Sequence, residues 1–311
     1  MLTLNMMSSP PGAGAGSVRF VELFCGIGGM ACAARAHGAR VVLAVDQDRA
    51  ACETYRRNHG MAPSPRNICN FTARELIDCG ADGWLLSPPC QPFTRKGKGL
   101  DDADPRTLPL LHLIDLLPRC RPALLFLENV PPFAGSRTHG RLLAALAAAD
   151  LHPFETIVCP TDLGIPNRRR RYYLLARRTP LDSSQVRLAG SAGGHSLAAY
   201  LDPDAGNDLV LSPRDLERLA GTDIIEPDGI AACFGSSYGH ALRRSGSYLA
   251  VPHMGGTGVR RFSPDEILRL LHFPGDFSFP PALTAAQRYR LAGNSVNVAV
   301  VERLLKILLN G

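Results

Sequence analysis

A cysteine lies in a rigid stretch of the chain, Ser-Pro-Pro-Cys-Gln-Pro at residues 87–92. Proline fixes its own φ angle and disfavours the helical conformation in the residue before it, so this segment is expected to be neither a helix nor a central strand. A stiff loop of this kind can aim the sulfur of Cys90 at a substrate. Cysteines that only fill a core are far more common than catalytic ones, so the surroundings of Cys90 decide the interpretation.

Three groups that could act with Cys90 occur where strands are expected to end or begin. Glu128 ends the apolar run Ala-Leu-Leu-Phe-Leu-Glu, where partial burial would suit it to donate a proton. Arg169 and Arg171 belong to an Asn-Arg-Arg-Arg-Arg run, and in an extended segment they would face the same side. Together with Arg95, these cations would lower the pKa of the Cys90 thiol. Alternatively, Glu128 pairs with an arginine, and the arginine run is a solvated surface or a targeting signal.

A glycine-rich turn, Phe-Cys-Gly-Ile-Gly-Gly at 24–29, follows the first expected strand. Ligands of doubly wound sheets bind beyond the C-terminal ends of the strands, where glycine lets the backbone approach them closely. Asp46 ends the next strand and could accept hydrogen bonds from ribose hydroxyls. Each feature alone could equally be a turn or a solvated aspartate. Because the spacing is G-x-G-G and not G-x-G-x-x-G, S-adenosylmethionine fits better than NAD.

The elements that must position these groups alternate regularly. Apolar strand-like runs followed by helical patterns predict an α/β fold with a mostly parallel, doubly wound sheet. The expected strands are 18–24, 41–45, 83–86, 123–127, 155–159 and 172–176, and the expected helices are 30–37, 49–58, 108–117 and 142–149. Ser263 can cap a further helix, and the apolar helix 296–309 is expected to pack back on the sheet.

The alternation stops after Arg178. Residues 179–262 are rich in Gly, Ser, Pro and Asp without a clear period, as expected for a small inserted lobe. The predicted organisation is a catalytic domain of residues 18–178 and 263–311, this lobe, and a disordered tail of residues 1–17.

Composition narrows the class of protein. With 45% hydrophobic and 20% charged residues, the 311-residue chain is typical of soluble globular proteins. Its sequence has no membrane-spanning apolar run and no secretory signal. The nine cysteines form no CxxC pair and no metal-ligand spacing, so a cytoplasmic location and no metal are expected. The net charge of +6 favours a polyanionic partner, and no obligate protein partner is indicated.

Taken in order, five motifs resemble those of the cytosine-C5 methyltransferases. They are F-x-G-x-G-G at 24–29, Pro-Pro-Cys-Gln at 88–91, Glu-Asn-Val at 128–130, Asn-x-Arg-x-Arg at 167–171 and Gly-Asn-Ser-Val at 293–296. The resemblance covers residues 18–309 and implies the S-adenosylmethionine-dependent methyltransferase fold. It also implies that the lobe of residues 179–262 recognises the target. Within the family, the chain is most similar to the tRNA-directed branch, which modifies an anticodon-loop cytosine of tRNA-Asp.

The similarity to that branch lies in a few segments. They are Ser87 where DNA enzymes usually have glycine, Asp-Pro-Arg-Thr at 104–107, Leu-Gly-Ile-Pro-Asn at 163–167, Cys-Phe-x-x-x-Tyr-Gly at 233–239 and the segment 287–298. Two positions depart from the expected pattern, because Gly235 replaces the usual threonine and Asn67 stands where cofactor-contacting acids often occur. These departures bear on the substrate more than on the chemistry.

The resemblance also implies roles for individual residues. The Cys90 thiolate would attack C6 of the cytosine while Glu128 donates to or binds N3. Arg169 and Arg171 would hold the base O2 and the loop that carries the thiolate. S-adenosylmethionine would supply the methyl group to C5. The cofactor site would be lined by Phe24, Ile27, Gly28, Gly29, Asp46, Ile68, Ser87, Asn294 and Ser295.

The expected partner is therefore the anticodon loop of a tRNA, in which a cytosine leaves its stack at less cost than in a duplex. A DNA cytosine-C5 methyltransferase is the alternative, since it would share every catalytic residue. A non-catalytic nucleic-acid-binding module would not need Cys90, and an NAD oxidoreductase would need a different glycine spacing.

Overall fold

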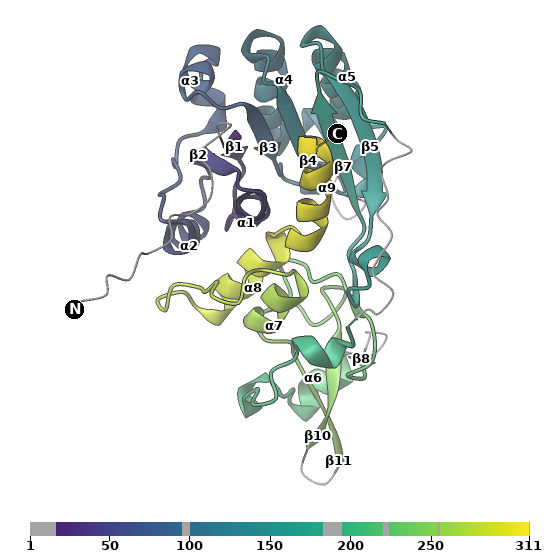
Figure 1. Ribbon diagram of the computed structural model, residues 1–311. Helices are drawn as coiled ribbons and strands as arrows, with labels where there is room; N and C mark the ends of the chain where they lie inside the picture. The colour runs from purple at the N-terminus through teal and green to yellow at the C-terminus, as the bar shows by residue number, and fades with distance from the viewer. Residues whose placement is uncertain (1–16, 95–99, 183–194, 220–223, 254–255, 311) are drawn as a thin grey trace, which may run out of the picture.

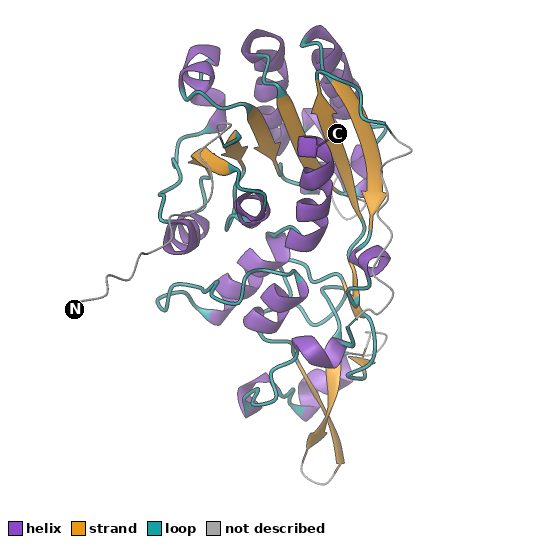
Figure 2. Cartoon of the chain, in the orientation of Figure 1, coloured by secondary structure: helices purple, strands orange, loops and turns teal. Residues whose placement is uncertain are grey.

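The computed structural model describes residues 17–94, 100–182, 195–219, 224–253 and 256–310 (Figure 1). The predicted tail lies outside these ranges except for Ser17, and Arg95 also lies outside them. A six-stranded sheet flanked by helices forms the upper part of the molecule in Figures 1 and 2, and smaller sheets and short helices form the lower part.

The main sheet is mostly parallel, as predicted. Its strands are β1 (Arg19–Leu23), β2 (Arg40–Val45), β3 (Gly83–Leu86), β4 (Leu124–Asn129), β5 (His152–Val158) and β7 (Arg171–Arg177). They lie in the order β2-β1-β3-β4-β7-β5. The neighbours among β2, β1, β3 and β4 pair in parallel, whereas β7 is antiparallel to both β4 and β5. The C-terminal ends of the four parallel strands therefore meet at one edge.

Helices cover both faces of this sheet (Figure 1). They are α1 (Gly29–Ala36), α2 (Arg49–His59), α3 (Ala73–Asp78), α4 (Leu108–Cys120), α5 (Arg137–Ala148) and α9 (Val298–Asn310). Alternate strand residues enter two different cores, as the period of two in a strand requires. Leu85 and Phe126 share a core with α1 and α9, whereas Trp84 and Leu125 share a core with α3, α4 and α5. Within the described ranges, no helix is long and apolar enough to cross a membrane.

The lower part contains short elements. They are β6 (Asn167–Arg168), α6 (Pro213–Arg218), β8 (Ile224–Ile225), β9 (Ala231–Ala232), β10 (Tyr248–His253), β11 (Gly256–Arg260), α7 (Pro264–Leu270) and α8 (Ala285–Asn294). Strands β11, β10 and β8 form one small sheet, and β6 pairs in parallel with β9. The arginine run thus begins on a strand that joins the catalytic segment to the predicted lobe.

Helices α7 and α8 pack against the predicted lobe. Arg260 forms a fully buried ion pair of 2.7 Å with Glu266 of α7, and the rings of Tyr238 and Tyr289 meet edge to face. Helix α8 also reaches the main domain, because Arg290 pairs with Asp48 next to α2. The domain boundaries at residues 178 and 262 remain predictions about the organisation of the chain.

Candidate active site

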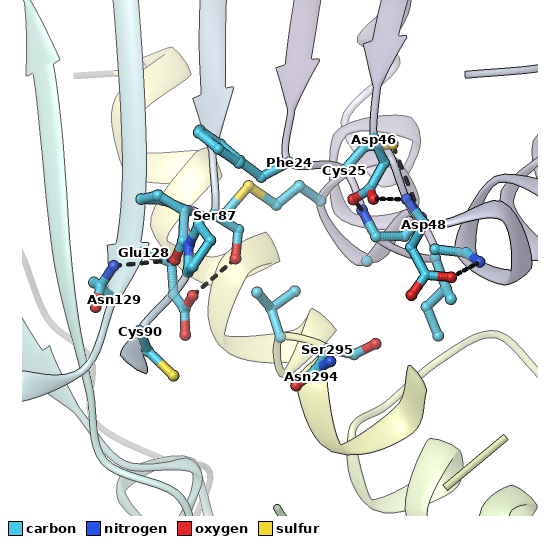
Figure 3. Close-up of a pocket in the computed structure, with 18 of the residues that line it drawn as sticks. Phe24, Cys25, Asp46, Asp48, Ser87, Cys90, Glu128, Asn129, Asn294 and Ser295 are labelled. Atoms are coloured by element: carbon cyan, nitrogen blue, oxygen red, sulfur yellow. Dashed lines mark hydrogen bonds between the residues drawn. The ribbon is translucent and has the colours of Figure 1, made fainter. Parts of the chain in front are cut away.

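A cavity of about 500 Å³ lies at the edge where the parallel strands end (Figure 3). The residues that follow or end β1, β2, β3 and β4 all reach it, and α8 and the α8–α9 connection close its other side. Among the described residues, its lining comes from segments 22–171 and 291–296. None of the described residues of the predicted lobe lines this cavity.

The structure brings most of the predicted site residues together. Those that line the cavity are Phe24, Ile27, Gly29, Asp46, Ile68, Ser87, Cys90, Glu128, Arg169, Arg171, Asn294 and Ser295. Gly28 is not among the lining residues, and its place in the cofactor site stays a prediction. It has a φ of +88°, and a Cβ added there would lie 2.2 Å from Nε2 of His59. Both the positive φ and this close contact with α2 require glycine at this position.

The loop that carries Cys90 is fixed at several points. Cys90 directly precedes a 3-10 turn formed by Gln91–Phe93. Asn129 Nδ2, at the end of β4, donates a 3.2 Å hydrogen bond to the Pro88 carbonyl. Downstream, the ring of Phe93 packs edge to face on Phe133 with a centroid distance of 4.9 Å. The prolines and these contacts hold the sulfur at the cavity wall, as the sequence predicted.

The pKa of Cys90 differs in direction from the prediction. Burial raises the pKa of this thiol above its ordinary value, and the nearby Glu128 carboxylate raises it further. The Arg171 and Arg169 guanidiniums lower it, but they do not outweigh the loss of hydration. The predicted depression of the pKa is therefore wrong. In the free protein at neutral pH, Cys90 is mainly a thiol.

Glu128 lies next to the Cys90 loop and is only 7% exposed. Its Oε1 is 3.2 Å from Nε of Arg171, and its Oε2 accepts a 3.0 Å hydrogen bond from the Ser87 hydroxyl. Figure 3 shows this second contact between the ends of the neighbouring strands β3 and β4. Glu128 therefore both pairs with an arginine and lies in the cavity, so the two alternatives considered for it hold together.

Arg169 and Arg171 face the same side, which confirms the prediction. Their guanidinium groups also hydrogen-bond to distant parts of the chain. Both contact the sulfur of Cys233, at 3.3 Å from Arg169 Nη1 and 3.5 Å from Arg171 Nη2. Arg169 also donates to the backbone carbonyls of Phe234, Gly293 and Ser295. It is 4% exposed, and its Nε is a buried donor without a partner among the described residues. Arg169 thus ties the lobe to the segment after α8.

Cys233 is a residue that sequence reasoning did not place in the site. Burial alone would raise the pKa of its thiol, but the Arg169 and Arg171 guanidiniums outweigh burial, and the net pKa is lowered. The only sequence signal was the Cys-Phe pair that opens the 233–239 cluster. The cationic environment predicted for Cys90 thus also reaches Cys233, and there it outweighs burial.

The second half of the cavity is suited to an adenosine group. Phe24 has a φ of +58°, a conformation that a side-chain-bearing residue adopts only when its surroundings impose it. Asp46 accepts 2.8 Å hydrogen bonds from the backbone amides of Gly26 and Asp48, one on each oxygen. Burial raises its pKa above the ordinary value. Each carboxylate oxygen retains a lone pair that a ribose hydroxyl could use.

Glu22 is another lining residue that the sequence analysis missed. It is 1% exposed, and burial raises its pKa to about 8. Tyr55 Oη donates a 2.8 Å hydrogen bond to Oε2, and the amide of Ala31, in the first turn of α1, donates to Oε1 at 3.3 Å. The sequence analysis did not single it out, because one acidic residue in an apolar strand does not change the pattern that predicts the strand.

Known proteins with similar sequences and structures include several methyltransferases. The model of the C-5 cytosine-specific DNA methylase family matches residues 18–195 and 235–310. The tRNA (cytosine(38)-C(5))-methyltransferase of Spodoptera frugiperda is 32% identical over 329 residues, covering 94% of this chain and 99% of that protein. The DNA (cytosine-5)-methyltransferase of Dictyostelium discoideum is 29% identical, with 94% of each chain covered. The solved structure of the Entamoeba histolytica methyltransferase EhMeth has a TM-score of 0.87 at 27% identity, covering 95% and 99% of the two chains.

Proposed function

The chain belongs to the C-5 cytosine-specific DNA methylase family, and on that premise we propose that it methylates C5 of a cytosine in the anticodon loop of a tRNA, tRNA-Asp by resemblance. The observation that carries the choice of tRNA is the 32% identity, over 94% of this chain, to a tRNA cytosine methyltransferase. The general activity, transfer of a methyl group to C5 of cytosine, is that of the family.

In the proposed mechanism, the base half of the cavity holds the cytosine. The Cys90 sulfur forms a bond to C6, and Glu128 gives a proton to N3, so that no full negative charge develops in the ring. Arg171 holds Glu128 in place through its Nε at 3.2 Å. After C5 is methylated, loss of the C5 proton and of the Cys90 sulfur restores the aromatic ring.

We propose S-adenosylmethionine as the cofactor, which when bound supplies an electrophilic methyl group. Phe24 offers a ring face for adenine, and Asp46 offers acceptors for the ribose hydroxyls. Asp46→Ala should weaken cofactor binding about 10- to 100-fold in calorimetry, since a hydrogen bond to a charged group contributes about 1.5–3 kcal/mol. Unchanged affinity would place the ribose elsewhere.

The lobe supports RNA more than duplex DNA. Its aromatic side chains in the described ranges are buried: Tyr200, Phe234, Tyr238, Tyr248 and Phe262. Without exposed aromatic residues there, the described lobe offers arginines for phosphate contacts. Binding by charge and shape suits an RNA whose loop already presents unstacked bases.

The scattered cysteines, all free of disulfides, agree with the proposed cytoplasmic location.

The deciding experiment measures methyl transfer from labelled S-adenosylmethionine to total tRNA and to duplex DNA of mixed sequence, followed by mapping of the labelled base. Label in one anticodon-loop cytosine of tRNA supports the proposal, and its presence in tRNA-Asp supports the finer assignment. The named activity of the Dictyostelium discoideum relative keeps DNA as the second candidate. Equal or faster methylation of the duplex would replace the RNA assignment with the DNA one.

A further inference from the structure

The hydroxyl of Ser87 contacts the residue assigned as proton donor, and the mechanism so far gives it no role. Building on the proposed function, we infer that Ser87 is a positioning residue that places the proton of Glu128 on Oε2, the oxygen that then donates to N3 of the cytosine. Ser87 lines the cavity, and its Oγ lies 3.0 Å from that oxygen. Its predicted place in the cofactor site stays a prediction, and the inference gives it a task toward the base as well.

The two oxygens of Glu128 have different neighbours. Oε1 faces the Nε of Arg171 at 3.2 Å, and Oε2 faces the Ser87 hydroxyl. Arginine has only donors, so a proton on Oε1 would point at another N–H. A serine hydroxyl can donate to a carboxylate and can also accept from a carboxylic acid. Of the two oxygens, only Oε2 thus faces a group that can accept as well as donate a hydrogen bond.

The strand register keeps the hydroxyl in this position. Leu86 of β3 is paired with Leu127 of β4, so the residues that follow, Ser87 and Glu128, are adjacent at the sheet edge. The Ser87 amide donates to the Leu23 carbonyl at 3.4 Å, and Pro88 is the next residue. The backbone that carries Oγ therefore has little freedom to move away from Glu128.

The contact also links the acid to the nucleophile. Ser87 begins the loop that ends at Cys90, and the same loop accepts a hydrogen bond from Asn129, the neighbour of Glu128. The Cys90 thiol first loses its proton to solvent. As a lone pair of the thiolate forms the S–C6 bond, the C5=C6 π electrons shift into the ring toward N3. N3 then takes the proton from Oε2, and its O–H bonding pair stays on Glu128. The resulting carboxylate is held by Arg171 and by the Ser87 hydroxyl, which turns to donate.

The hydroxyl is the part of Ser87 that matters for this contact. A glycine or alanine at position 87 would leave Oε2 without this partner. A buried acid oxygen without a partner is costly and less well oriented. The serine thus adds orientation to Glu128.

The test compares Ser87→Ala and Ser87→Gly with Ser87→Thr, which keeps a hydroxyl. Because the hydrogen bond that is removed goes to the reacting carboxyl group, Ala and Gly should lower kcat by about 10- to 100-fold. The KM for the RNA and the calorimetric Kd for S-adenosylmethionine should stay within about twofold, and Thr should keep kcat within about threefold of wild type. Ser278→Ala serves as the matched control, because its hydroxyl accepts from Arg57 and does not line the cavity.

A second readout isolates the covalent step. RNA that contains 5-fluorocytidine has no C5 proton to lose, so it should accumulate a protein–RNA adduct, and adduct formation should slow in Ser87→Ala by the same factor as kcat. A kcat within about twofold of wild type in Ser87→Ala, or a fall in kcat that Thr does not restore, would overturn the inference. Failure of the proposed function would be seen separately, as wild-type protein that methylates neither tRNA nor DNA.

Discussion

Two cysteines, Cys90 on the loop after β3 and Cys233 in the lobe, lie within the field of the same two arginines, but their thiols respond in opposite directions. Burial raises the pKa of Cys90 despite Arg171 and Arg169. At Cys233, where burial also opposes ionisation, the same guanidiniums lower the net pKa. The difference is direct contact, since both arginines reach the Cys233 sulfur within 3.5 Å.

The contrast shows that the contacts of Arg169 and Arg171 with Cys233, and of Arg171 with Glu128, serve different purposes. At Cys233 both arginines contact the lobe, whereas at Glu128 only Arg171 of the two holds the carboxyl group through a direct contact. Cys90 receives a rigid loop and a position, but its thiol stays mostly protonated before substrate binds.

The largest effect should come from comparing the two cysteines directly. Cys90→Ala should lower methyl transfer by roughly 10⁴-fold or more, because no other group can form the bond to C6. Cofactor affinity measured by calorimetry should stay within about twofold, since the adenosine half of the cavity is formed by other loops. Cys233→Ala should retain measurable turnover. Methylation by Cys90→Ala at the wild-type rate would contradict the assignment of the nucleophile.

The next largest effect should come from Arg171, which contacts both Glu128 and Cys233. Arg171→Gln removes the partner of Glu128 Oε1 and one contact to Cys233. Leaving a buried charge unpaired costs about 3–5 kcal/mol, so both urea-unfolding stability and activity should fall, the latter by about 100-fold. Arg170→Gln is the matched control, because that side chain is exposed and only its backbone carbonyl contacts Arg171. Equal behaviour of the two variants would mean that Arg171 does not hold the acid.

The main domain was well predicted because its elements are long or fully buried. Gly83–Leu86 is buried at every position, and its predicted bounds are those observed. Helices α3 and α8 were missed, although capping boxes at Thr72–Glu75 and Thr284–Gln287 marked their starts. Two-residue strands such as β9 have no period to read, since they exist only through pairing with a distant strand.

The site was predictable where chain order alone determines position. Parallel strands bring their C-terminal ends to one edge, so the proximity of Cys90 and Glu128 followed from the alternation of elements. Two features did not follow. The approach of Cys233 depends on how the lobe folds across 62 residues of separation from Arg171. The pKa of Cys90 depends on burial, which competes with charge and cannot be read from the residue types nearby.

The pKa contrast can be sharpened by alkylation. Below its pKa, the thiolate fraction of a cysteine rises about tenfold per pH unit, and only the thiolate reacts with iodoacetamide. Because the pKa of Cys90 is raised, its alkylation rate should climb by about this factor per unit between about pH 7 and 9. The rate at Cys233, followed in the same digests by mass spectrometry, should depend less on pH. A rate at Cys90 that is flat over this range would show a thiolate and support a lowered pKa there.

The smallest effect concerns the outer end of the lobe segment that begins at Cys233. Arg243 and Arg244 are exposed there on a turn fixed from beneath, since Tyr248 Oη donates to the Leu242 carbonyl at 3.1 Å and Ser245 Oγ to the Ala241 carbonyl at 2.6 Å. A rigid turn can present both cations to phosphates without ordering a flexible loop first.

Changing Arg243 and Arg244 together to Ala should weaken tRNA binding several-fold and leave cofactor affinity unchanged. Removing one cation–phosphate interaction should reduce the slope of log affinity against log salt by about 0.7 for single-stranded RNA, so the double change should reduce it by roughly 1.4. Filter binding between about 50 and 200 mM salt measures this slope. Arg74→Ala is the control, because Arg74 is also exposed but lies on α3, outside the lobe. An unchanged slope would mean that the lobe contacts no phosphate at this turn, and that the Cys233 segment serves the catalytic domain alone.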